Sequence, residues 1–383
     1  MRAPAPVGHL VHGMGTAMET PTWPAITTDE AAAVIARFPA AGRLMALHWH
    51  SPRPFSAATL VHTTEGAFFL KRHHHSLRSV AGLAEEHAFI AHLASAGVSV
   101  PEILSTADGA TAVAWGEWSY ELHREGPGLD LYRDSLSWTP FLSHAHAHAA
   151  GVALARLHVA ARSFTAPARR LQPLVASSTI LPAADPIAAV EAYVAARPAM
   201  AAFLAARPWR RELGQLFAAL GEGLPSMLAD QVPLWTHNDW HPSNLLWADD
   251  GSVRTVFDFG LADRTCAVHD IATAIERTAV QWLKLGQGED ATIADPDAAI
   301  ALLAGYATIQ PLSRSDIATI VRLLPLVHVE FALSEIDYFT EVVADPASAA
   351  LAWDEYLVGH AAWFRSAPGQ DFLRRIDAKG FRR

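Results

Sequence analysis

The hydrophobic pattern of the chain changes once, and this change constrains the fold more than any other feature. Residues 42–122 contain short apolar runs of the β type, separated by turn residues and interrupted by one good helix over about 79–96. After the Gly126-Pro127-Gly128 break, the period becomes helical and stays so to the end, apart from one hairpin pattern. Strands followed by helices, rather than alternating with them, predict an α+β fold with a small antiparallel-sheet lobe and a larger, mainly helical lobe.

The length supports two lobes, because 383 residues exceed the size at which a single hydrophobic core stops growing. We expect a disordered tail over residues 1–26, a first lobe over 27–122 and a second lobe over 123–383. Thr27 and Glu30 form a capping-box pattern that opens the first helix. Within the helical part, the turn Asp249-Asp250-Gly251 predicts a hairpin between helices.

The composition limits the partners and the compartment. A formal net charge of -10 argues against nucleic acid, which attracts clustered Lys and Arg, and is more compatible with a cationic small molecule. The sequence has no signal-peptide pattern and no apolar run of about 18 residues, so we expect neither export nor a membrane span. Cys266 is the only cysteine, which excludes an internal disulfide and favours a cytoplasmic protein with a buried, inert thiol.

A polar loop in the second lobe carries the residues that indicate chemistry. It reads His237-Asn-Asp239-Trp-His-Pro-Ser-Asn244, and Asp258-Phe-Gly260 follows the hairpin. Phosphoryl transfer requires a carboxylate beside the attacking hydroxyl and oxygen ligands for Mg²⁺. Because a hairpin returns the chain, it can bring Asp258 back alongside Asn244. The alternative is that these are ordinary turn residues, as Asn and Asp often are.

This segment resembles the aminoglycoside phosphotransferase superfamily, which includes choline and ethanolamine kinases and homoserine kinase. The family pattern of His-x-Asp-x-x-x-x-Asn, hydrophobic-Asp-Phe and Asp-hydrophobic-Ala is matched by His237, Asp239, Asn244, Asp258 and Asp270. The resemblance implies a protein-kinase-like, bilobal fold that uses ATP and Mg²⁺. It also implies that Asp239 accepts the proton of the substrate hydroxyl, that Asn244 and Asp258 hold magnesium, and that His237 and Asp270 brace the loop.

The same resemblance calls for a lysine and a glutamate in the first lobe. Lys71 ends the strand AFFLK, where an ammonium group can reach phosphate oxygens, although a lone strand lysine is more often solvent-facing. Glu86 lies eleven residues before Gly97, as the family's pairing glutamate does, and Glu85 is the fallback. The stretch HSPRPFSAAT contains no glycine where the phosphate loop should lie, so Ser56 is a candidate phosphate contact, with a plain strand-edge hydroxyl as the alternative.

Two other polar groups have competing interpretations. Histidines 73–75 and 144, 146 and 148 are the right residue type for a metal site, but these spacings do not converge on one point, so we expect surface side chains. Glu330, Ser334 and Asp337 share one face of a predicted helix. That face is either a site for a cationic acceptor or an ordinary solvated acidic face.

We therefore predict an ATP- and Mg²⁺-dependent phosphotransferase that acts on a hydroxyl group of a small molecule. The acceptor could be an aminoglycoside, a choline-like or homoserine-like compound, or a sugar. One alternative is a bacterial Ser/Thr protein kinase of the same fold, which the missing Ala-Pro-Glu signature disfavours. Another is a catalytically inactive nucleotide-binding scaffold, which the intact set of Lys71, Asp239, Asn244 and Asp258 disfavours.

Overall fold

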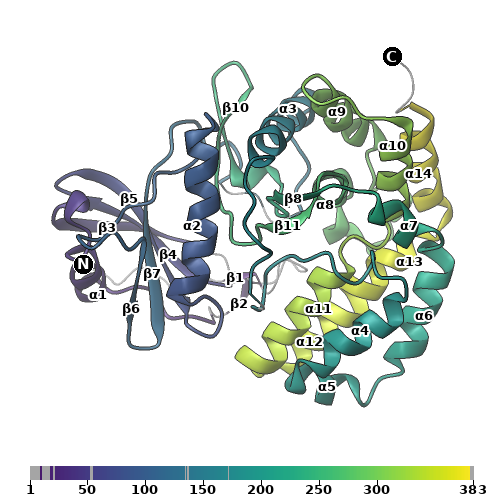
Figure 1. Cartoon of the computed structure of the whole chain (residues 1–383), viewed down its shortest axis with the longest axis horizontal. Coiled ribbons are helices and arrows are strands. Elements are labelled where there is room, and N and C mark those ends of the chain that lie inside the picture. Colours follow the sequence, from purple (N-terminus) through teal and green to yellow (C-terminus); the bar gives the residue numbers. More distant parts are fainter. Residues whose placement is uncertain are drawn as a thin grey trace. The chain divides into compact units, whose positions relative to one another are not determined.

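The computed structural model describes residues 9–10, 18–19, 22–51, 55–133, 135, 138–170 and 172–379 (Figure 1). The chain divides into two compact units. The first comprises Met1–Pro127 together with Arg169–Gln172, and the second comprises Gly128–Ala168 and Pro173–Arg383. The first unit contains an antiparallel sheet and the second is mainly helical, which confirms the predicted α+β class.

A five-stranded antiparallel sheet forms the centre of the first unit, in the order β3-β4-β5-β7-β6. Its strands are β3 (Leu44–His50), β4 (Ala57–Thr63), β5 (Gly66–His74), β6 (Ala112–Trp115) and β7 (Trp118–Arg124). A hairpin joins β4 to β5 at Gly66, whose φ of 125° favours glycine. Two further short strands, β1 (His9–Leu10) and β2 (Met18–Glu19), pair within the segment expected to be a disordered tail.

One face of this sheet packs with α1 (Thr28–Ile35). The predicted capping box is present, with Thr27 and Glu30 bonding to each other's backbone amides. Glu30 also pairs with Arg72 of β5 at 2.8 Å, which ties the helix to the sheet. The hydrophobic core of this unit includes Ile26, Ala31, Val34, Ile35, Phe38, Val61, Phe68, Leu70, Tyr120 and Leu122. The ordered lobe therefore begins before the predicted boundary at residue 27.

The opposite face carries polar side chains and packs with α2 (Val80–Ser95), whose N-cap is Ser79. Lys71 of β5 lies directly opposite Glu121 of β7 in the strand register. Because side chains alternate along a strand, Lys71, Glu121 and His123 share the face that lies away from the core residues Leu70 and Leu122.

The described part of the second unit is built from helices and two small, two-stranded antiparallel sheets. The helices are α3 (His144–Ala161), α4 (Pro186–Ala195), α5 (Pro198–Leu204), α6 (Trp209–Leu220), α7 (Leu224–Ala229), α8 (Ala267–Ala279), α9 (Pro296–Ala307), α10 (Arg314–Leu323), α11 (Val329–Asp337), α12 (Pro346–Leu351), α13 (His360–Phe364) and α14 (Ala367–Lys379). The chain is π-helical at Tyr338–Val342 and Ala352–Gly359, and forms short 3₁₀ turns at Pro39–Ala41 in the first unit and at Pro242–Asn244 and Trp282–Lys284 in the second.

The predicted hairpin is confirmed: β9 (Leu245–Trp247) pairs with β10 (Val253–Val256) around the turn at Gly251. A second pair was not predicted, and it joins β8 (Pro233–Thr236) to β11 (Asp263–Cys266). Together the two pairs hold both ends of the polar loop and of the segment that contains Asp258. Cys266 is buried, and burial raises the pKa of its thiol to about 11, as expected for an inert cysteine.

Helices α3 and α9 approach each other very closely (Figure 1). A Cβ atom added to Gly151 would lie 2.0 Å from the carbonyl oxygen of Leu302, and one added to Gly305 would lie 1.9 Å from that of His148. Only glycine leaves room for backbone at these distances. The contact fixes the lateral position of α3, which carries a histidine that supports the polar loop, as described below.

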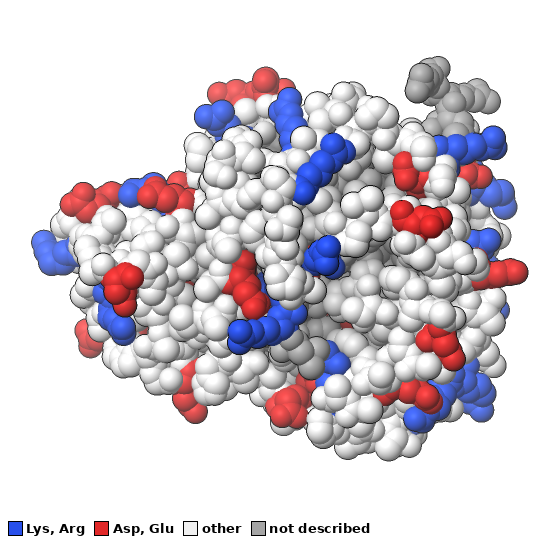
Figure 2. Space-filling model, in the orientation of Figure 1, with Lys and Arg blue, Asp and Glu red and all other residues white. Residues whose placement is uncertain are grey.

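The charged side chains are distributed without a single dominant area on the face seen in Figure 2, where blue and red groups are interspersed among white ones. Across the part of the chain that the structure describes, no single helix is long and apolar enough to cross a membrane. Helices α4 and α5 reach that length and composition only together, and a bend of 117° separates them.

Candidate active site

The polar loop begins where β8 ends, and the first turn of α8 holds its backbone. The two carboxylate oxygens of Asp270 accept hydrogen bonds from the backbone amides of His237 and Asn238, each at 2.8 Å. Asn238 has a φ of 60°, in the left-handed region that asparagine tolerates better than most residues. The loop conformation therefore depends on a buried carboxylate that lies 32 residues further along the chain.

Asp270 is itself held in place by the α3–α9 contact. His158 of α3 lies with Nε2 3.0 Å from Asp270 and with Nδ1 2.9 Å from the hydroxyl of Tyr306 on α9. Burial alone would raise the pKa of the Asp270 carboxyl, but its bonds to His158 and to the loop amides outweigh burial and lower it. Asp270 therefore remains an anion that accepts hydrogen bonds from the loop.

The ring of His237 links the loop to the segment that contains Asp258. Its Nδ1 accepts a bond of 3.2 Å from the amide of Asp239, so Nε2 carries the proton and donates to the carbonyl of Phe257 at 3.0 Å. This arrangement suits the bracing role that the resemblance implies, since no ring nitrogen remains for a reacting group.

Asp239 lies in the loop with polar partners on both carboxylate oxygens. The side-chain amide of Asn244 donates to Oδ2 at 3.0 Å, and the guanidinium of Arg277 forms an ion pair with Oδ1 at 2.7 Å. His241 lies 3.5 Å from the same oxygen. Burial alone would raise the pKa of Asp239, but Arg277 first and His241 second hold it well below its usual range. With 17% of its side chain exposed, Asp239 is an ionised carboxylate that solvent can still reach.

Asn244 and Asp258 are the residues expected to hold a metal ion. Because the amide nitrogen of Asn244 donates to Asp239, the amide oxygen remains as the atom that can bind a cation. The backbone amide of Phe257 donates to the carbonyl of Asn244 at 3.1 Å, which places Asp258 next to Asn244 in the fold. Asp258 has a φ of 61°, a conformation that is uncommon for a non-glycine residue and is found at functional sites. An amide oxygen and a carboxylate in this arrangement fit a hard cation such as Mg²⁺.

Sequence reasoning missed Arg277. It lies seven residues after Asp270 on α8, which is two helical turns, so both side chains face the polar loop. Its guanidinium also lies 5.3 Å from the ring of Phe331 on α11. The seven-residue spacing from Asp270 was the one sequence signal for Arg277. It did not single out Arg277, because the sequence does not show which face of the helix points toward the loop.

A small cavity adjoins Arg277 and the loop residue Asn238. It has about 10 Å³ of free space and its lining includes Thr273, Glu276, His328 and Tyr356. This volume holds about one water molecule. It is therefore not the binding site of an acceptor. Nearby, burial raises the pKa of Glu335 to about 8, against the opposing effect of Arg277.

The nucleotide-binding residues expected in the first lobe all lie in the first unit. Lys71 is half-buried on β5, and Glu86 is buried on α2, 3.5 Å from the guanidinium of Arg169. Arg169 is a partner that the sequence did not reveal. The fallback Glu85 forms an exposed pair with Arg170 at 3.6 Å. Ser56 is half-buried just before β4, and residues 52–54 of the same loop lie outside the described residues.

Both interpretations of the Glu330 helix face are wrong, because the face is buried and its acidic groups are already paired. The Glu330 carboxylate accepts from the backbone amides of Thr179 and Ile180 at 2.8 and 3.0 Å. Asp337 pairs with Arg197 at 3.2 Å. These carboxylates hold the chain around residues 177–180 and α5 rather than facing solvent or a cationic acceptor.

Known proteins share both sequence and fold with this chain. It is 26% identical over 280 residues to a homoserine kinase of Bradyrhizobium sp. (strain BTAi1 / ATCC BAA-1182), which covers 72% of this chain and 74% of the relative. Among solved structures, the amicoumacin kinase hAmiN, in complex with AMP-PNP, Ca²⁺ and Ami, has a TM-score of 0.56 at 15% identity, over 92% of this chain and 93% of that one. An aminoglycoside phosphotransferase from Alicyclobacillus acidocaldarius has a TM-score of 0.53 at 16% identity, over 96% and 99% of the two chains.

The fold expectation is thereby confirmed, because both solved structures are kinases whose folds match this chain over at least 92% of its length. The model of the phosphotransferase enzyme family matches residues 55–312. Because that match spans more than half of the sequence and contains the polar loop, the chain belongs to the phosphotransferase enzyme family.

Proposed function

We propose that this phosphotransferase transfers the γ-phosphoryl group of ATP to a hydroxyl group of a small molecule, with Mg²⁺ as cofactor. The observation that carries the proposal is the position of Asp239: an ionised, partly exposed carboxylate that lies beside the candidate metal ligand Asn244. Turn residues without a function would not require a buried histidine, a buried carboxylate and an arginine to hold them.

Asp239 orients the acceptor and receives its proton. In the reaction, a bond forms between the hydroxyl oxygen and the γ-phosphorus, the bond from that phosphorus to the β–γ bridging oxygen breaks, and the hydroxyl proton passes to Asp239. The low pKa of Asp239 makes it a weak base. Its main contribution is therefore to keep a negative charge and a fixed hydrogen-bond acceptor at the attacking oxygen, with proton transfer completed late.

The remaining residues divide between metal and nucleotide. Asn244 and Asp258 would hold Mg²⁺, which supplies charge neutralisation on the phosphate oxygens when it is bound. In the first unit we assign Lys71 to phosphate oxygens and Glu86 to orienting Lys71. Ser56 is a further phosphate contact in a loop without glycine.

The acceptor is a small alcohol rather than a protein side chain. Two proteins that this chain resembles support this class: one is a homoserine kinase, and the other, similar in fold at 17% identity and a TM-score of 0.51, is a microcompartment-associated aminopropanol kinase. The acidic face that suggested a cationic acceptor no longer supports one, because Glu330 and Asp337 are paired internally. We therefore include zwitterionic, cationic and neutral alcohols equally among the candidate acceptors.

The test is ADP release from ATP and Mg²⁺ with homoserine, aminopropanol, choline, an aminoglycoside and a simple sugar, each compared with a no-acceptor blank. For the active acceptor, Asp239→Asn should lower kcat by about 10²–10⁴-fold while ATP binding is retained. The matched control is Asp249→Asn, an exposed aspartate in the neighbouring hairpin turn, which should keep full activity. Full activity in Asp239→Asn would remove the basis of the mechanism, and phosphorylation of a protein but of no small alcohol would favour the protein-kinase alternative.

A further inference from the structure

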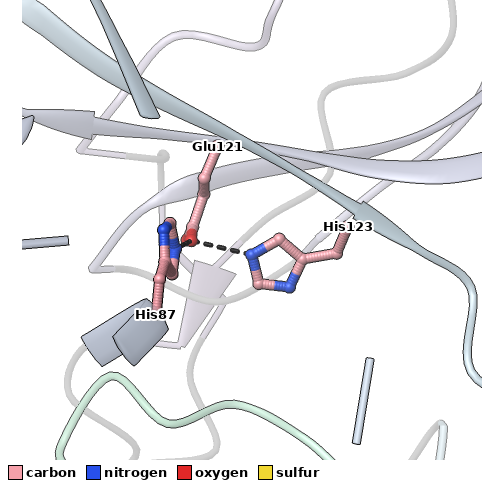
Figure 3. A group of neighbouring side chains, drawn as sticks. All are labelled: His87, Glu121 and His123. Carbon is pink, nitrogen blue, oxygen red and sulfur yellow. Dashed lines mark hydrogen bonds and ion pairs between the residues drawn. The ribbon is translucent and has the colours of Figure 1, made fainter. Parts of the chain in front are cut away.

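The polar face of the first sheet contains a buried cluster that phosphoryl transfer does not use. Three imidazole rings direct Nε2 at one carboxylate, that of Glu121 on β7. Figure 3 shows two of them, His87 and His123, beside Glu121. His87 and His123 lie 2.6 and 2.7 Å from Oε2, and His73 lies 3.0 Å from Oε1. The side chains of His87, Glu121 and His123 are 2%, 1% and 8% exposed, so water does not compete for these contacts.

Three separate elements bring the cluster together. Glu121 and His123 are two residues apart on β7 and therefore point to the same face, while His73 comes from β5 and His87 from α2. The histidine run at 73–75 thus contributes only its first member, and His87 lies far along the chain from both His73 and Glu121. This explains why spacing arguments could not find the cluster.

We propose that His87, Glu121 and His123 form a zinc site, with His73 beside it on the other oxygen of the Glu121 carboxylate. The ligand atoms of the first three residues all lie within 4.8 Å of one another. Bonds of about 2.0–2.1 Å to tetrahedral zinc place ligand atoms about 3.3 Å apart, so the 2.6 and 2.7 Å distances from His87 and His123 to Glu121 must lengthen by about 0.6–0.7 Å. Two imidazoles with a carboxylate are a ligand set that suits zinc and does not suit Mg²⁺.

The hydrogen-bond partners of His87 suit both its present contacts and the binding of a metal ion by its ring. Without metal, its Nε2 proton points at Glu121 and its Nδ1 accepts from the hydroxyl of Thr111 at 2.8 Å. A metal ion requires the lone pair of Nε2, so the proton must move to Nδ1. A threonine hydroxyl accepts a hydrogen bond as readily as it donates one, so Thr111 then orients the ring as the outer partner of a metal-bound histidine.

A zinc ion here would join α2 to β7 beside the residues assigned to the nucleotide. His87 follows Glu86 on α2, and Glu121 lies opposite Lys71 in the register of β5 and β7. Zinc would therefore fix the helix that carries Glu86 against the strand pair that carries Lys71. This consequence rests on the proposed function, whereas zinc binding itself does not.

Zinc binding is tested on the full chain by stripping metal with a chelator and titrating ZnCl₂ in the absence of nucleotide. The wild type should bind one zinc per chain at the buried cluster, and the melting temperature should rise with zinc. The double variant His87→Gln with His123→Gln should weaken this binding by at least about 100-fold, as loss of direct ligands requires. The matched control is His62→Gln, because His48 and His62 form an exposed ring pair, 3.9 Å between centroids, in the same sheet.

Equal zinc affinity in the double variant, or loss of binding in His62→Gln alone, would overturn the proposal. If the double variant does not fold, anomalous X-ray scattering at the zinc edge from wild-type crystals gives the answer without a substitution. A peak between His87, Glu121 and His123 supports the site, and a peak only at the exposed pair, or none after zinc soaking, refutes it. Zinc content and acceptor phosphorylation are separate measurements, so either proposal can fail while the other holds.

Discussion

The substitution Gly305→Ala tests how packing between α3 and α9 reaches the active site. The new Cβ would lie 1.9 Å from the carbonyl oxygen of His148 and 2.7 Å from its carbonyl carbon. Ordinary carbon–oxygen contacts lie at about 3.3 Å or more, so the helices must separate by roughly 1.4 Å. Because the opposing atoms are backbone, no side chain can rotate away. Overpacking of this kind costs about 1–3 kcal/mol or more, and the better helix propensity of alanine returns up to about 1 kcal/mol.

The matched control is Gly214→Ala on α6, where no atom lies within 4 Å of the added Cβ. Alanine should stabilise that helix by up to about 1 kcal/mol. We therefore expect the two variants to differ by about 1–3 kcal/mol or more in unfolding free energy, with Gly305→Ala the less stable, because the gain in helix propensity is common to both. Urea unfolding followed by tryptophan fluorescence measures the difference. Equal midpoints for the two variants would refute the steric reasoning.

Gly305→Ala should also lower kcat under conditions where the variant is folded. Tyr306 follows Gly305 and bonds to His158, which in turn bonds to Asp270. Separation of α3 from α9 therefore disturbs the carboxylate that holds the catalytic loop, whereas Gly214 has no such connection. A destabilised but fully active variant would mean that the loop does not depend on this packing.

Three further substitutions test the electrostatics of the site. Burial raises the pKa of Glu335 to about 8, against about 4.3 in an unfolded chain. Between about pH 4.3 and pH 8 the native state therefore binds a proton that the unfolded chain has lost. The free energy of unfolding then falls as the pH rises, by up to roughly 1.4 kcal/mol per pH unit. Glu335→Gln should therefore gain stability relative to wild type from pH 5 to pH 9 in thermal melts, and a constant difference would contradict the assignment. Arg277→Gln should lower the unfolding free energy of the wild type by about 1–3 kcal/mol more than it lowers that of the Asp239→Asn variant, because that variant has already lost the charge that pairs with Arg277. If the effects of the two substitutions on the unfolding free energy simply add, the two side chains are not coupled. Asp270→Asn replaces one of the two carboxylate oxygens that accept from the loop amides with an NH₂ group. In steady-state assays, kcat should therefore fall by a larger factor than the KM for ATP changes. An unchanged kcat would show that the loop keeps its shape without this anion.

Much of the fold was predictable because it depends on local patterns. The change from strand to helix periodicity, the capping box at Thr27 and the hairpin at Gly251 each depend on residues within a few positions of one another. The proximity of Asp239 and Asn244 was predictable for the same reason, since both belong to one short loop. The β8–β11 pair was missed because two four-residue strands far apart in the sequence carry no local signal of pairing.

What sequence reasoning missed depends on long-range contacts. Glu330 was read as an acceptor site or a solvated acid because helical spacing gives a face but does not say what covers it. The pairing of Glu86 with Arg169 and the cluster at Glu121 join segments that no spacing rule connects. These errors all concern which buried polar groups form hydrogen bonds or ion pairs with one another. The packing of distant segments determines these partners.

Helix α8 connects these observations, because it is buried on every side from Val268 to Ala279 and still carries charged groups toward the catalytic loop. Asp270 holds the loop's backbone and Arg277 holds its carboxylate, two turns further along the same face. A shift of α8 by one residue would rotate both side chains by about 100° and would leave the loop amides and Asp239 without partners. Since α8 is buried from Val268 to Ala279 and contacts β8, β11, α9 and α10, core packing sets the position of the helix, and α9 is in turn placed by its close contact with α3 at Gly305. The geometry of Asp239 is therefore a property of the whole helical core rather than of the polar loop alone, and we expect substitutions far from the loop to change activity.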